Sequence, residues 1–276
     1  MVKIVRFKLT FKLKKEEIPL DYRRYFLFFL KTALKEEAKE FYYENYESFN
    51  GNKINRVKPF TFSLLLNNPK FLEDKIILDN SNVIFNFSCY EYEWGINFYN
   101  SMTKMLNKPF DITKDNTMTL ESINMMKNRV VRTRTVVFKT MSPIIVRHHD
   151  KDGRNNALNN HLSYSDEGFL KQLKVNILES LKCLNDFSEY EISRDIEKMT
   201  IEMIRMKSVW IAHFTERIKK RVIGNVGVLK IIAEPYILDF LYKAGIGSRR
   251  SQGFGMVEIA VVDAKEEVKR IERGQD

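Results

Sequence analysis

The chain has 276 residues, a length that allows one large domain or two of ordinary size. Its residues are 44% hydrophobic and 30% charged, a composition typical of a globular protein with a core. Its 20 Phe and 12 Tyr argue against disorder, and no apolar run reaches the roughly 18 residues of a membrane span. The net charge of +10 favours a polyanionic partner, with a merely basic protein as the alternative.

Two cysteines, Cys89 and Cys183, without a CxxC pair argue against a disulfide framework and against a zinc site. The first residues alternate charged and apolar side chains instead of forming the apolar stretch of a secretory signal. We therefore expect a cytoplasmic protein that does not act at a membrane, has no zinc site and needs no cofactor.

The first half predicts a strand, a helix, a strand pair, a helix and a strand. Apolar residues alternate with basic ones from Val5 to Lys14, which indicates a half-buried strand. Apolar residues at helical spacing then predict one helix from about Asp21 to about Tyr43, followed by a loop at 44–58. The remaining expected elements are a strand at 58–66, a hairpin of 75–80 with 83–89, a helix at about 91–106 and a strand at about 117–126.

The second half repeats this order of elements without repeating the residues. We expect a long strand at 130–146, a polar loop at 147–168 and a helix capped by Asp166. Strands near 198–207 and 220–233, a short helix at 236–243 and a strand at 256–262 follow. The βαββαβ order in each half predicts an α+β fold of two tandem ferredoxin-like domains, 1–128 and 129–276.

The segment GIGSRRSQGFGMVEI, residues 245–259, is the most informative motif. Glycines permit positive φ and a close backbone approach, successive backbone N–H groups can bind an anion, and arginine forks suit phosphate. The motif lacks the GK[ST] of a Walker loop, and it runs from helix to strand, the reverse of a dinucleotide-binding loop. The alternative is a tight connection without a ligand.

Three segments together carry a family resemblance. The GxG…GFG loop, FTFSLLL at 60–66 and MSPIIV at 141–146 occur in the order and places typical of the CRISPR repeat-processing endoribonucleases, part of the RAMP superfamily. The chain resembles that family over nearly its whole length.

The resemblance implies a protein that binds the CRISPR repeat in precursor RNA, cuts once per repeat without metal, and keeps the mature crRNA as a monomer or homodimer. The alternative is a catalytically weak or inactive repeat-RNA binder, or a subunit of a CRISPR effector complex. A basic RNA-binding protein unrelated to CRISPR does not explain the three ordered segments.

Metal-free RNA cleavage needs a base for the 2′-hydroxyl, an acid for the leaving oxygen and positive charge near the phosphorus. Many relatives carry a histidine near the end of the first helix, whereas this chain has none before His148. The resemblance places Tyr43 at the position of that histidine, with Tyr46 nearby. It places Lys58 where some members of the family have a lysine, and Lys31 near another polar catalytic position of the family. His148 and His149, on the loop after the MSPIIV strand, offer another route.

Further cations are expected to hold the RNA backbone. Arg132 and Arg134 are predicted on one face of a strand, and Arg205 and Lys207 repeat that spacing. The candidate RNA-binding residues of the glycine loop are Gly245, Gly247, Ser248, Arg249, Arg250, Ser251, Gln252, Gly253 and Gly255.

Overall fold

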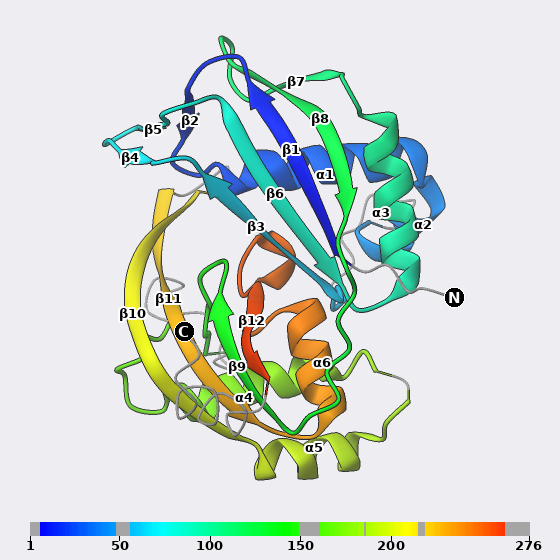
Figure 1. The fold of residues 1–276 in the computed structure, drawn as a ribbon, viewed down its shortest axis with the longest axis vertical. Coiled ribbons are helices and arrows are strands. Elements are labelled where there is room, and N and C mark those ends of the chain that lie inside the picture. The colour runs from blue at the N-terminus through cyan, green and yellow to red at the C-terminus, as the bar shows by residue number, and fades with distance from the viewer. Residues whose placement is uncertain (1–5, 48–55, 149–160, 185, 215–218, 263–276) are drawn as a thin grey trace, which may run out of the picture. The chain divides into compact units, whose positions relative to one another are not determined.

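The computed structural model describes residues 6–47, 56–148, 161–184, 186–214 and 219–262 (Figure 1). Contacts divide the chain into two compact units. The first comprises 1–128 with short segments at 212–219 and 251–253, and the second comprises the rest. Because two segments of the second half group with the first unit, the predicted contiguous domains 1–128 and 129–276 stay a proposal.

The first unit contains a five-stranded antiparallel sheet in the order β3-β6-β1-β8-β7. Alternating apolar side chains of the central β1 point into the core, and a β-bulge lies at Thr10/Phe11 in its pairing with β8. The strands are β1 (Arg6–Leu13), β3 (Phe60–Leu66), β6 (Asn82–Cys89), β7 (Pro109–Asp111) and β8 (Thr117–Met125). Apart from the added β7, this is the strand order of a ferredoxin-like sheet.

Helices α1 (Arg23–Glu37) and α3 (Tyr92–Lys104) pack together over one face of this sheet (Figure 1). The core beneath them is aromatic, and the rings of Phe87 and Phe98 stack with centroids 3.7 Å apart. The single helix predicted over 21–43 is wrong, because the chain turns at Ala38 (φ −123°, ψ 57°) and begins a second helix, α2 (Lys39–Asn45).

The predicted hairpin of 75–80 with 83–89 is also wrong. β6 pairs with β1 on one side and β3 on the other, which leaves no free edge for a further strand. The segment before it forms β5 (Lys75–Ile77), which pairs with β2 (Glu17–Pro19) and β4 (Lys70–Phe71) in a separate three-stranded sheet. Buried Ile18 and Ile76 lie opposite each other there.

The second unit repeats the ferredoxin-like strand order as β10-β11-β9-β12. Its strands are β9 (Thr135–Thr140), β10 (Thr200–Phe214), β11 (Lys219–Ile232) and β12 (Val257–Val262). Its helices are α4 (Phe169–Leu181), α5 (Glu189–Lys198) and α6 (Pro235–Ala244), with a 3₁₀ turn, η1, at Arg250–Gln252. The fold class predicted from the sequence, two ferredoxin-like halves, is confirmed.

The long strand predicted over 130–146 is wrong, because only its middle part forms a strand, β9. The backbone N–H groups of Met141 and Ser142 both donate to Met256 O, and Pro143 has no N–H, so the ladder ends there. Arg132 and Arg134 precede β9 and do not share a strand face as predicted.

Two helix details of the second unit differ from the prediction. Gly168, with φ 81°, caps α4, while the side chain of Asp166 accepts from Ser163 N. Helix α5, which was not predicted, begins with a capping box between Ser188 and Glu191. Among the described residues, no helix is long and apolar enough to cross a membrane.

We expect Phe98→Ala to lower the free energy of unfolding of the first unit by about 3–5 kcal/mol, because it empties the centre of the aromatic core. Phe28→Ala, at an exposed position of α1, is the matched control and should cost far less. Urea denaturation measures both variants. Equal losses would contradict the assignment of Phe98 to the core.

Candidate functional site

Two lysines and one tyrosine converge in the first unit. Lys31 comes from α1, Tyr46 ends α2, and Lys58 lies just before β3. The Nζ atoms of Lys31 and Lys58 both lie over the Tyr46 ring, each 4.9 Å from its centroid. The structure thus brings together three of the predicted catalytic residues, which we call the lysine pair and its tyrosine platform.

The Tyr46 ring is fixed by other aromatic rings. It stacks on Tyr42, with centroids 5.2 Å apart, and meets the edge of Trp94 at 6.1 Å. Burial, followed by the neighbouring Tyr42, raises the pKa of Tyr46 well above its usual range. Its hydroxyl is buried and accepts or donates no hydrogen bond within the described residues. Tyr46 is therefore poorly suited to accept a proton, and it serves as a positioning residue through its ring.

Lys58 has the properties of a base near neutral pH. Its ammonium donates to Arg56 O at 3.0 Å and is partly buried. Burial, then the positive charges of Lys31 and Arg56, lowers the pKa of Lys58 to about 8. An unperturbed lysine has a pKa near 10.4, so Lys58 holds far more of the neutral, proton-accepting form at pH 8.

Tyr43 belongs to a neighbouring group of side chains. It meets Tyr42 edge-on at 5.6 Å, and Lys35 Nζ lies over its ring at 5.6 Å. Lys35 in turn forms an ion pair with Glu47 at 3.3 Å. Tyr43 is half-buried, so it stays a candidate at the border of the lysine pair.

The predicted histidines lie elsewhere in the chain. His148 is exposed in the second unit, next to Arg147, whose backbone forms an isolated β-bridge with His161. His149 falls outside the described residues.

The glycine loop is a tightly hydrogen-bonded structure. Ile246 N donates to Gly255 O, Gly255 N to Pro143 O, and Ser248 N to Ile145 O, at 2.7–2.9 Å. Gly245, Gly247, Gly253 and Gly255 all have positive φ. At Gly247 and Gly255 a Cβ atom would also collide with a backbone carbonyl, so the path of the loop requires glycine there.

The two arginines of the loop point to different environments. Arg250 is buried, donates to Ala244 O at 3.0 Å and lies over the Phe240 ring at 5.2 Å. Burial lowers its pKa to about 10. Its guanidinium therefore braces the loop from inside, and a contact between Arg250 and RNA stays a prediction. Arg249, by contrast, is only partly buried.

Arg147 is a functional candidate that sequence reasoning missed. Burial first, and then the charge of Arg147, lowers the pKa of Arg249, so the two guanidinium groups lie within electrostatic reach. Asn176 joins their segments, since its Oδ1 accepts from Arg147 N at 3.0 Å and from Ser248 Oγ at 2.9 Å. The position of Arg147, directly after MSPIIV, was the signal in the sequence.

The remaining predicted cations lie on the surface. Arg205 and Lys207 are exposed on β10, and Arg132 is exposed before β9. Arg134 is occupied by an ion pair with Glu234 at 3.1 Å. Ser251 and Gln252 are half-buried in η1.

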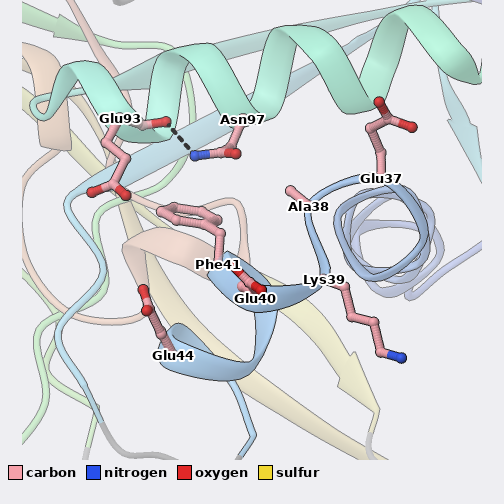
Figure 2. Close-up of a pocket in the computed structure, with 8 residues that line it drawn as sticks. All are labelled: Glu37, Ala38, Lys39, Glu40, Phe41, Glu44, Glu93 and Asn97. Atoms are coloured by element: carbon pink, nitrogen blue, oxygen red, sulfur yellow. Dashed lines mark hydrogen bonds between the residues drawn. The ribbon is translucent and has the colours of Figure 1, made fainter.

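An acidic cavity of about 470 Å³ lies where α1 meets α2 beside α3 (Figure 2). Its lining includes Glu37, Glu40, Glu44 and Glu93, and Asn97 donates to the Glu93 carbonyl at 3.0 Å. Within the described residues no three His, Cys, Asp or Glu side chains are placed to hold a metal ion. Its negative charge makes this cavity unsuited to a phosphate backbone.

A comparison with protein-family models finds a match in the second half of the chain. Residues 126–259 match the family model described as CRISPR associated protein Cas6, C-terminal. No curated protein sequence matches the chain.

Several solved structures resemble the chain in fold. The product of a Cas6-related gene from Pyrococcus furiosus matches with a TM-score of 0.74 and 19% identity, over 94% of this chain and 100% of that one. A RAMP protein binding different RNA substrates matches with 0.74 and 19%, over 93% and 100%. A Cas6 product complex matches with 0.67 and 13%, over 93% and 99%.

We expect Lys58 to react with an amine-acylating reagent at pH 8 far faster than the exposed lysines, because more of it is neutral. Competitive labelling across pH, read by mass spectrometry, should give an apparent pKa near 8. Lys31→Met should raise that pKa by removing a like charge, whereas Lys35→Met, on the same helix, should leave it unchanged. A Lys58 pKa equal to that of exposed lysines would contradict this electrostatic account.

Proposed function

We propose that the chain is a protein of the Cas6 type, since its residues 126–259 match the Cas6 C-terminal family model, and that it binds CRISPR repeat RNA and cuts the precursor once within each repeat. The observation that carries the proposal is the convergence of Lys31 and Lys58 on Tyr46. This cluster supplies a base and a cation, which cleavage by the 2′-hydroxyl needs.

In the proposed reaction, neutral Lys58 Nζ removes the proton of the 2′-hydroxyl next to the scissile phosphate. The 2′-oxygen attacks the phosphorus, the bond to the 5′-oxygen breaks, and the leaving oxygen takes up a proton. The products are a 2′,3′-cyclic phosphate and a 5′-hydroxyl. The Lys31 ammonium stabilises negative charge on the phosphorane, and the nucleophile needs only to be aligned, because it is already attached.

Tyr46 contributes by position rather than by proton transfer. Its ring attracts both ammonium groups, while its buried hydroxyl offers no proton acceptor near neutral pH. The missing early histidine is thereby replaced by a lysine whose pKa is lowered to about 8.

The RNA backbone is proposed to contact exposed and partly buried cations of the second unit. Arg205, Lys207, Arg147 and Arg249 are the candidates, and the net charge of +10 supports a salt-dependent affinity. We also propose that the protein acts in the cytoplasm without metal, as a monomer or homodimer that retains crRNA. Delivery of the crRNA to an effector complex belongs to the same proposal.

Incubation with labelled repeat RNA in EDTA should give one cut per repeat, and a 2′-deoxy nucleotide at the cut site should abolish it. Lys58→Met should slow single-turnover cleavage by about 100-fold or more, in line with loss of a general base. RNA that is bound tightly but never cut would support the alternative, a repeat-RNA binder without nuclease activity.

Tyr46 gives a paired test of the platform. Tyr46→Phe keeps the ring and removes a buried hydroxyl, so cleavage should persist and thermal stability should not fall. Tyr46→Leu removes the ring and should slow cleavage strongly while RNA binding changes little. If the Phe variant were as slow as the Leu variant, the hydroxyl would be the functional group.

Cleavage should accelerate with pH and level off near pH 8, because the base must be deprotonated and its pKa is lowered to about 8. The measurement is the single-turnover rate constant of cleavage against pH. Lys31→Met should move the bend to higher pH, since Lys58 then keeps its proton longer. A rate that falls above pH 8 would instead identify Lys58 as a required cation.

A further inference from the structure

A large aromatic side chain lies exposed on the second unit. Trp210, in the edge strand β10, is 69% exposed, whereas Trp94, the other tryptophan of the chain, is 2% exposed in the first unit. β10 and β11 run side by side as the longest strands of the unit (Figure 1).

Hydrogen bonds show which residues share a face with Trp210. Ser208 Oγ donates to Asn225 Oδ1 at 3.0 Å, so these two side chains lie on the same face of the β10–β11 ribbon. Side chains two residues apart in a strand point the same way. Trp210 therefore shares this face with Ile223 and Arg221, which we call the tryptophan face.

The opposite face of the same ribbon is the buried one. Ile211 and Val222 belong to a core cluster with Ile145 and Phe254, and Val209 packs against it. Gly224 lies against Ile211 on that side, which fixes the same alternation independently. Ile211 is buried and Val209 is partly buried, so Trp210, which lies between them in sequence, points away from this core.

The exposed cation Arg221 lies on the tryptophan face. Arg205 and Lys207 are exposed farther along the same edge strand, but they alternate with Trp210 and so lie on the side of Val209 and Ile211. Lysine and arginine on an edge strand disfavour the addition of another protein strand. An exposed indole beside a cation is instead the combination that binds unpaired nucleic acid, because a base can stack on the ring while its phosphate meets the cation.

We propose that the tryptophan face binds an unpaired segment of RNA, with a base stacked on Trp210 and a backbone phosphate held by Arg221. This site rests on the proposed RNA-binding function and adds a binding residue outside the glycine loop and the lysine pair. Stacking of this kind tolerates any base, so the site supplies affinity for single strands rather than sequence choice.

The test measures binding of oligo(A) and oligo(U) of about 12 nucleotides, a length that one such groove covers, and of a paired RNA duplex of the same length. Trp210→Ala should weaken binding of the single strands by about 10-fold and leave the duplex within about 2-fold. Trp210→Phe should retain part of the affinity. Tyr190→Ala removes an equally exposed aromatic side chain from α5 and should change nothing.

Fluorescence reports the contact directly, since Trp94 is buried. Saturating unlabelled oligo(A) should protect the indole emission from acrylamide, and the protection should vanish in Trp210→Ala. Unchanged RNA binding by Trp210→Ala, or acrylamide quenching that RNA does not alter, would overturn the proposed site on the tryptophan face but not the proposed function. A wild-type protein that binds no RNA would overturn the proposed function as well. A loss of self-association in Trp210→Ala, with RNA binding unchanged, would assign the face to a second copy of the chain.

Discussion

Two ammonium groups held over one buried tyrosine ring are the arrangement on which the functional account depends. The attraction of each cation to the ring of Tyr46 partly offsets the mutual repulsion of Lys31 and Lys58. Burial first, and then the positive charges of Lys31 and Arg56, lowers the pKa of Lys58 and frees its lone pair at a pH where lysine is ordinarily protonated. One geometric feature thus produces both a base and a neighbouring positive charge.

The turn at Ala38 makes the arrangement of Lys31 and Lys58 over the Tyr46 ring possible. It ends α1 and starts α2 as a separate helix, in which Tyr42 and Tyr46 are four residues apart and face the same side. Their stacked rings, with Trp94 at the edge, hold the platform while Lys31 reaches it from α1. A continuous helix to residue 43, as the sequence analysis expected, would not have turned these rings in this way.

The sequence was sufficient for the architecture because alternating and helical apolar patterns record burial directly. It could not identify strand partners, so β5 was assigned to β6 although it pairs with β2 and β4. It also could not show that the guanidinium of Arg250 braces the glycine loop from inside, where it donates to Ala244 O. The family resemblance identified Lys31, Tyr46 and Lys58 as candidates. That the two ammonium groups lie over the Tyr46 ring could be seen only in the structure. Arg147 was overlooked although it directly follows MSPIIV, because a single cation after a strand does not by itself predict a ligand contact.

The most direct measurement of the central claim is a crystal structure of the protein with repeat RNA that carries a 2′-deoxy nucleotide at the cut site. The account predicts the scissile phosphate within hydrogen-bonding distance of Lys31 Nζ, with the 2′ position of the preceding sugar next to Lys58 Nζ. A scissile phosphate bound elsewhere, for example beside His148, with the lysine pair remote from the RNA, would contradict it.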